Sequence, residues 1–167
     1  MKQKHVKIEH VTHDDIAPFF DENSKILILG SMPSKKSREE KFYYMHPQNR
    51  FWKILEAIFK EPIQSKEEFL ITHHIALWDS IASCDIKGAS DASIKNVIPN
   101  DLSKILINTN IKQIFTAGKT AEKFYRKYNY ENTKIDSICL PSTSPANCRI
   151  SFEQMVEEWK IIKEYLK

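Results

Sequence analysis

The polar segment at residues 31–50 combines aromatic rings with cationic side chains, a mixture that suits a nucleic acid. An unstacked base can lie against the rings while the cations face the phosphate backbone. The alternative is a solvated basic loop that one aromatic side chain anchors to the core. The rings and cations are Phe42, Tyr43, Tyr44, His46, Lys35, Lys36, Arg38, Lys41 and Arg50.

A second polar segment, residues 141–149, places three hydroxyl side chains between two prolines. The hydroxyls belong to Ser142, Thr143 and Ser144, and the segment ends at the cation Arg149. Proline restricts the backbone, and short hydroxyls beside free N–H groups can bind phosphate oxygens. A plain turn is the alternative, since the same residue types are common in turns.

Asn49 stands where the sequence predicts the start of a helix, and two roles compete for its side chain. Asparagine is a favoured N-cap, in which its oxygen accepts a backbone N–H. The amide can instead point into a pocket, and one oxygen cannot serve both purposes fully. A carboxylate, Asp79, also follows an apolar run and can lie near the same site, but a capping or turn role is favoured for it.

Alternating strands and helices must position these residues. Apolar runs predict strands at residues 25–30, 75–80, 111–115 and 135–140. Helical spacing of apolar residues predicts helices at residues 14–20, 49–59, 67–74, 100–107, 120–128 and 151–166, with a loop-rich region at 81–99. This alternation indicates an α/β sandwich with a parallel sheet, at whose carboxyl edge both polar segments meet.

The chain of 167 residues is expected to form a single domain, residues 1–167. Its net charge of +3 is weak evidence for a polyanionic partner. No apolar run approaches the ~18 residues of a transmembrane helix, and the N-terminus lacks the apolar core of a signal peptide. The three cysteines are widely spaced, which is typical of reduced thiols in a cytoplasmic protein.

The motifs of common cofactor sites are missing from the sequence. The first polar segment contains neither GxxxxGK[ST] nor GxGxxG, so a nucleotide-phosphate cradle of those kinds is not indicated. The six histidines do not show the spacing of a metal site. No cofactor and no metal are therefore expected.

Taken together, these segments resemble the uracil-DNA glycosylase superfamily, and within it the hypoxanthine (deoxyinosine) DNA glycosylase branch. The combination of HPxNRFW with LPSTSPAN is specific, although mismatch-specific uracil glycosylases share the first element. The blocks follow the family's order and cover most of the chain from about residue 25 onward. They are residues 30–34, 43–52, 77–79, 88–91 and 140–147.

The resemblance implies a three-layer α/β/α sandwich with a central four-stranded parallel sheet. It implies a monofunctional enzyme that hydrolyses the N-glycosidic bond of a deaminated base without metal or cofactor. The implied partner is DNA containing a deaminated or mismatched base, with no membrane, and a monomer is expected.

By resemblance, residues 30–34 form the first active-site motif, which contains Ser31 and Met32. Backbone N–H groups there are expected to stabilise the departing base. Many members of the wider superfamily carry Asp or Asn in this motif to position the water, whereas Met32 cannot orient water. The branch relies on a downstream asparagine, here Asn49. Many relatives also have Asn before the glycine of the third strand, where this chain has Ala117.

Tyr44 is expected to stack on the extruded base, with His46 beside it. Hypoxanthine and uracil share an edge that places a carbonyl acceptor next to an N–H donor, and an asparagine amide can bind both groups. Asn49 or Asn147 can supply that amide. The residues expected to contact DNA are Arg50, Ser142, Thr143, Ser144 and Arg149.

Other functions remain open at this point. One is a mismatch-specific uracil or thymine glycosylase, and another is a non-catalytic binder of damaged DNA on the same scaffold. Met32 and Ala117 favour the binder, whereas Asn49 and the complete second segment favour the enzyme. A small-molecule α/β enzyme is disfavoured by the missing nucleotide motifs.

Overall fold

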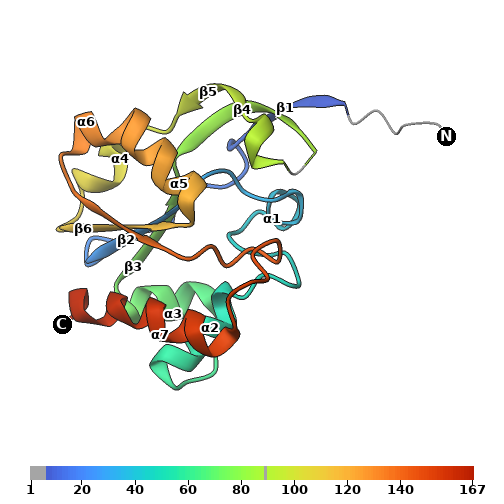
Figure 1. Ribbon diagram of the computed structural model, residues 1–167. Helices are drawn as coiled ribbons and strands as arrows, with labels where there is room; N and C mark the ends of the chain where they lie inside the picture. The colour runs from blue at the N-terminus through green and yellow to red at the C-terminus, as the bar shows by residue number, and fades with distance from the viewer. Residues whose placement is uncertain (1–6, 89) are drawn as a thin grey trace.

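A four-stranded parallel sheet forms the centre of the computed structural model, which describes residues 7–88 and 90–167 (Figure 1). The strand order is β3-β2-β6-β7. The strands are β2 (Ile26–Gly30), β3 (Ile75–Asp79), β6 (Gln113–Ala117) and β7 (Ser137–Leu140). Every residue of β2 and β3 is buried, as expected for parallel strands that are covered on both faces. The four predicted strands are confirmed, with shifts of at most two residues at their ends.

Helices cover both faces of this sheet (Figure 1). One face carries α2 (Phe51–Phe59), α3 (Lys66–His73) and α7 (Phe152–Trp159), and the other carries α4 (Ser103–Leu106), α5 (Lys119–Phe124) and α6 (Tyr130–Thr133). A π-helical turn, η2 (Tyr125–Asn129), joins α5 to α6, and a 3₁₀ helix, η3 (Lys160–Tyr165), continues α7. This is the expected three-layer α/β/α sandwich.

A second sheet corrects the sequence interpretation of residues 81–99. It is antiparallel, has the order β1-β4-β5 and is made of β1 (Ile8–Thr12), β4 (Ile81–Lys87) and β5 (Lys95–Pro99), with a 3₁₀ turn, η1 (Asp91–Ser93), between the last two. Only one residue of β1 and none of β5 is buried, so these edge strands lack the apolar signal on which the prediction relied. Residues 14–20 form turns and one isolated bridge rather than the expected helix.

The first polar segment is less of a loop than expected, because α1 (Lys35–Glu40) interrupts it. Ser34 caps this helix by accepting a hydrogen bond from Ser37 N at 3.1 Å. The Ser37 hydroxyl in turn accepts from Met45 N at 3.0 Å, which ties the following turn back to the helix.

Some expectations fall outside what the structure describes. Ala89, in the block at 88–91 that resembles the family, and residues 1–6 of the expected domain lie outside the described residues. Within residues 7–88 and 90–167, no helix is long and apolar enough to cross a membrane. The same residues contain no group of three or more His, Cys, Asp or Glu side chains placed to hold a metal ion.

Candidate active site

The carboxyl ends of β2 and β3 lie side by side, and the first polar segment follows β2. Gly30, the last residue of β2, pairs in register with Asp79, the last residue of β3. The Gly30 carbonyl oxygen accepts a hydrogen bond from Ser80 N at 2.9 Å, and the Ser31 carbonyl oxygen accepts from Ile81 N at 3.1 Å. The start of the segment is therefore fixed to the chain that leaves β3.

A side chain has no room at Gly30, because a β-carbon there would overlap Asp79 Oδ1. The same position lies 3.6 Å from the hydroxyl oxygen of Tyr44. A carboxylate and a phenol therefore converge over the backbone of Gly30, and this close approach requires glycine.

Asp79 is held by His13, a residue 66 positions away in the sequence. His13 Nε2 lies 2.6 Å from Asp79 Oδ2, and its Nδ1 lies 2.8 Å from the Ile16 carbonyl oxygen. The two side chains are only 3% and 5% exposed. Burial alone lowers the pKa of His13, but the hydrogen bond to Asp79 and the charge of Asp79 outweigh it, so the pKa lies above its usual value of 6.5.

Tyr44 adopts an unfavourable conformation at this edge. Its φ of 55° lies in the left-handed region, which bulky residues rarely enter. Its ring stacks on Phe51 with 3.9 Å between centroids and 18° between planes. Its hydroxyl is buried and has no hydrogen-bond partner among the described residues. Burial, followed by the charge of Asp79, raises the pKa of Tyr44, so the phenol is neutral. Strain of this kind clusters at functional sites.

Neighbouring aromatic residues anchor the segment to the core. Tyr43 is only 2% exposed, and its hydroxyl donates to the Ala17 carbonyl oxygen at 2.7 Å. The Tyr43 carbonyl oxygen accepts from Trp52 Nε1 at 3.2 Å, while Phe42 stacks on the Trp52 ring. Tyr43 therefore has the anchoring role that the alternative interpretation gave to one aromatic residue, and Phe42 and Tyr44 also pack against the core.

Asn49 uses its amide oxygen locally. Asn49 Oδ1 accepts a hydrogen bond from Phe51 N at 2.9 Å, at the start of α2. Its Nδ2 has no hydrogen-bond partner among the described residues, so the donor half of the amide is left for a ligand. His46 lies in the preceding turn, where its Nδ1 accepts from Gln48 N at 3.1 Å and its carbonyl oxygen accepts from Asn49 N.

The second polar segment follows β7 and packs against Gly118. A β-carbon at Gly118 would lie 2.9 Å from the β-carbon of Ser142, and the Gly118 φ of 101° also favours glycine. Asn147 Nδ2 donates to the Ser142 carbonyl oxygen at 2.9 Å, and the Ser144 hydroxyl accepts from Ala146 N at 3.2 Å. The segment is thus organised by its own short-range hydrogen bonds.

Arg50 connects the two polar segments. Its backbone N donates to the Thr143 carbonyl oxygen at 3.1 Å. Its guanidinium donates to the carbonyl oxygens of Asn147 at 2.6 Å and Ile150 at 2.8 Å. The structure therefore brings the start of α2 into contact with Thr143, Asn147 and Ile150, as expected for strands that end at one edge.

The remaining predicted site residues are placed differently. The side chain of Met32 packs against the hydrophobic cluster between the second sheet and α5, which includes Val11 and Phe124. Thr143 is only 2% exposed, so its hydroxyl offers little surface to a phosphate. Arg149 is exposed beside the second segment.

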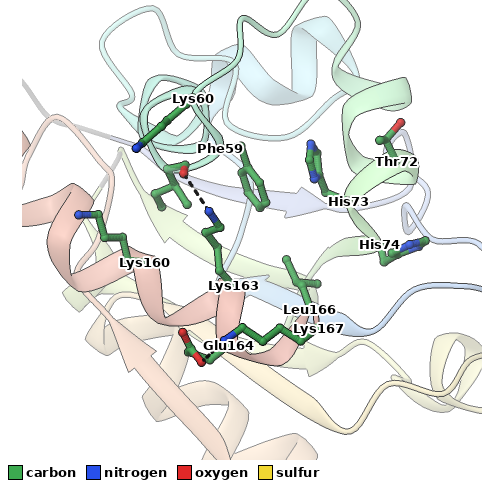
Figure 2. Close-up of a pocket in the computed structure, with 11 residues that line it drawn as sticks. Phe59, Lys60, Thr72, His73, His74, Lys160, Lys163, Glu164, Leu166 and Lys167 are labelled. Carbon is green, nitrogen blue, oxygen red and sulfur yellow. Dashed lines mark hydrogen bonds and ion pairs between the residues drawn. The ribbon is translucent and has the colours of Figure 1, made fainter.

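Figure 2 shows a separate cavity of about 680 Å³ at the opposite edge of the sheet. It is lined by His74, which directly precedes β3, and by Lys163 of η3. The His74 carbonyl oxygen accepts from Lys25 N at 2.8 Å, which places the cavity at the amino ends of β2 and β3. None of the predicted site residues lines it.

The superfamily model for uracil DNA glycosylases matches residues 17–163, a range that contains both polar segments and the whole parallel sheet. The chain belongs to the uracil DNA glycosylase superfamily. The resemblance that the motifs indicated is confirmed, together with the α/β fold expected from it.

Individual members of the superfamily are similar over most of the chain. The hypoxanthine DNA glycosylase of Methanosarcina barkeri is 38% identical over 141 residues, which cover 79% of this chain and 86% of the relative. That of Methanosarcina acetivorans is 34% identical over 151 residues, covering 85% and 92%. The solution NMR structure of a candidate uracil DNA glycosylase from Methanosarcina acetivorans has a TM-score of 0.76, with 29% identity, over 90% of this chain and 96% of that one.

The sequence did not reveal the contact between Asp79 and His13 at this edge of the sheet. The capping role considered for Asp79 is wrong, because its carboxylate binds a buried imidazole rather than a backbone N–H. The available signal was a carboxylate at the end of an otherwise apolar strand. Nothing in the sequence pointed to His13, which meets Asp79 only through the tertiary fold.

Proposed function

We propose that this protein is a monofunctional DNA glycosylase that hydrolyses the N-glycosidic bond of deaminated bases, with hypoxanthine in deoxyinosine as its main substrate. The observation that carries the proposal is the 34–38% identity to two hypoxanthine DNA glycosylases over 79–85% of the chain. The products are the free base and an abasic site in the DNA.

Base extrusion is the first requirement, since a base inside a duplex cannot be reached. Tyr44 is proposed to receive the extruded base on its ring, which Phe51 already supports from one side. Aromatic stacking binds any base, so it does not select the substrate. Mispaired bases are easier to extrude, which favours deaminated bases before any contact is made.

Recognition of the base edge is proposed to be divided between two asparagines. Asn49 keeps its Nδ2 donor, because its oxygen is bound to Phe51 N. Asn147 keeps its Oδ1 acceptor, because its Nδ2 is bound to the Ser142 carbonyl oxygen. A carbonyl next to an N–H, as in hypoxanthine and uracil, matches this donor and acceptor. His46 is proposed to line the same edge.

The departing base carries negative charge, which donors at the end of β2 are proposed to stabilise. The backbone N–H groups of Ser31 and Met32 make no backbone hydrogen bond among the described residues. Preorganised donors of this kind stabilise developing charge without rearrangement during the reaction. Met32 thus acts through its backbone, while its side chain packs against the second sheet.

The flanking DNA strand is proposed to lie along the second segment. Phosphates are expected to meet the hydroxyls of Ser142 and Ser144 and the exposed Arg149. We infer that the protein acts as a monomer on DNA that contains a deaminated or mismatched base. We also infer that it acts in the cytoplasm, because the free thiols of Cys84, Cys139 and Cys148 are compatible with a reducing compartment.

The test is cleavage of end-labelled duplexes that carry one deoxyinosine, deoxyuridine, deoxyxanthosine or G·T mismatch, with abasic sites revealed by alkali. Cutting at deoxyinosine above the others supports the proposal. Cutting only at uracil or thymine supports a mismatch-type uracil glycosylase, a second candidate favoured by the similarity to the candidate uracil DNA glycosylase structure. Binding without cutting by folded protein overturns both.

A further inference from the structure

Hydrolysis of an N-glycosidic bond needs a group that holds the attacking water and accepts its proton. Met32 offers no such group, and its side chain is packed among apolar residues. The acceptor oxygen of Asn49 is bound to Phe51 N. Neither Met32 nor the Asn49 oxygen is therefore available, and the Ser31 hydroxyl of the first motif, although it can accept a hydrogen bond, is a far weaker base than a carboxylate. The site needs a base from another element.

Resting on the proposed function, we propose that Asp79 is the catalytic residue that holds and deprotonates the attacking water, and that His13 is the positioning residue that fixes it. The evidence is where each oxygen of the Asp79 carboxylate lies. Oδ2 is bound by His13 Nε2 at 2.6 Å. Oδ1 makes no hydrogen bond among the described residues and is not closed off from solvent.

The free oxygen lies at the edge of the sheet where the other site residues gather. Asp79 Oδ1 occupies the space that a β-carbon would take on Gly30, the first residue of the active-site motif. The Tyr44 hydroxyl approaches the same position at 3.6 Å. The oxygen thus lies against the backbone of Gly30, on the side that the Tyr44 hydroxyl also approaches.

His13 holds this carboxylate in one orientation. A backbone carbonyl only accepts, so the contact with Ile16 O requires a hydrogen on His13 Nδ1. With Asp79 as the acceptor, the contact with Oδ2 places a second hydrogen on Nε2, and the ring is then an imidazolium beside a carboxylate. Such a pair is stable in a buried place when further hydrogen bonds satisfy it, as the Ile16 carbonyl does.

The chemical step balances with these groups alone. A water oxygen forms a bond to the sugar C1′ while the bond from C1′ to the base nitrogen breaks, and that bond's electron pair leaves with the base. The water proton moves to Asp79 Oδ1 and is later lost to solvent. General base catalysis of this kind contributes roughly 10²- to 10⁴-fold to rate.

The test measures single-turnover excision of hypoxanthine by wild type and D79N. D79N should lose at least about 100-fold in rate, while its affinity for the same DNA stays within about twofold. The pH profile of the excision rate should also differ between wild type and D79N, because the variant lacks the carboxylate. H13Q should lose less rate than D79N, since glutamine still donates to Oδ2.

Chemical rescue separates catalysis from folding. Formate should restore part of the rate to D79A, whose shortened side chain leaves space for a carboxylate, and it should not restore the rate of N49A. If D79N does not fold, the neutral pair H13Q/D79N keeps a hydrogen bond without either charge, and its rate loss gives the same comparison.

Three outcomes overturn the assignment of Asp79. A wild type that is inactive on all four duplexes removes the proposed function as well. An active wild type with an equally active, folded D79N removes Asp79 alone. A D79N enzyme that stays fast but cuts at normal adenine or cytosine gives Asp79 the task of reading the base instead of holding water.

Discussion

Arg50 Nη2 donates a hydrogen bond to the Asn147 carbonyl oxygen at 2.6 Å, across 97 positions of sequence. The other terminal nitrogen donates to the Ile150 carbonyl oxygen at 2.8 Å. The guanidinium therefore holds the end of the second polar segment against the start of α2. Arg50 was expected to contact DNA. In the structure its guanidinium already binds two backbone carbonyl oxygens, and a DNA phosphate would have to bind the same guanidinium beside them.

Arg50→Ala removes both of these bonds, and it should destabilise the protein by about 2–3 kcal/mol, because hydrogen bonds to charged groups are stronger than neutral ones. Excision should fall as the second segment loosens. Urea unfolding of the variant and of wild type measures the first effect. Arg50→Lys, which cannot donate in the same fork geometry, should lie between them. If Arg50→Ala left the free energy of unfolding unchanged, the two hydrogen bonds would not stabilise the contact between the second segment and α2.

The exposed Arg149 should behave differently from Arg50. Arg149→Ala should leave the free energy of unfolding within about 0.5 kcal/mol of wild type, as is usual for surface substitutions. If Arg149 meets one phosphate, the slope of log affinity against log salt should flatten by about 0.9. Titration of a labelled duplex at several salt concentrations measures the slope. An identical slope would place Arg149 off the DNA interface.

The parallel sheet could be predicted because its strands are apolar and flanked by turns, whereas the second sheet could not. All residues of β2 are buried, so the strand appears as an unbroken apolar run. β5 has no buried residue and contains polar side chains and a proline, which read as a loop. Its stability comes from pairing with β4, and pairing between distant segments leaves no local pattern in the sequence.

Asn49→Ala should reduce turnover far more than DNA affinity. The free Nδ2 is the group proposed to meet the base, so its loss weakens a contact made only with the extruded nucleotide. Loss of the Oδ1 contact with Phe51 N also removes one hydrogen bond before the first turn of α2, which costs about 1 kcal/mol. Asn49→Asp separates the two effects, because it keeps the acceptor and removes the donor. Equal activity in a folded Asn49→Ala protein would remove Asn49 from the mechanism.

Gly30→Ala should be damaging despite the small size of the change. The new methyl group would overlap Asp79 Oδ1 and must displace the carboxylate or the strand. Overpacking of this kind costs about 1–3 kcal/mol. The excision rate should fall with stability, since the displaced carboxylate is the proposed base. Ala57→Ser, at an exposed position of α2, is the control in thermal melts and rate measurements. Wild-type activity in Gly30→Ala would show that the position of Asp79 Oδ1 does not matter.

The candidate site was predictable where its residues are close in sequence. Tyr44 and Asn49 share one segment with the first motif, so their composition alone indicated a ligand site. The contact between His13 and Asp79 joins β3 to the turn after β1. The residues next to each of them in the sequence form no motif that indicates a site. The importance of this contact depends on the burial of both side chains and on the two hydrogen bonds of the imidazole. Neither can be known before the chain is folded.

The raised pKa of His13 makes a prediction about stability and pH. A group whose pKa is higher in the folded state stabilises the fold fully below its unfolded pKa of about 6.5, and this contribution is lost as pH rises through the folded value. Tyr43 and Trp78 pack around the imidazole, so Asp79 is the charged group that faces it. The free energy of unfolding should therefore fall as pH rises above neutral, measured by urea unfolding in steps from pH 6 to 9.

His13→Gln should lack that dependence, because glutamine does not titrate. His13→Ala should cost about 3–5 kcal/mol at pH 6, since it leaves the buried carboxylate of Asp79 without its partner. The difference between wild type and His13→Ala should then shrink as pH rises and the wild-type imidazole loses its proton. A difference that stays constant across this range would mean that His13 is uncharged in the fold, and that Asp79 is held by a neutral hydrogen bond rather than by an ion pair.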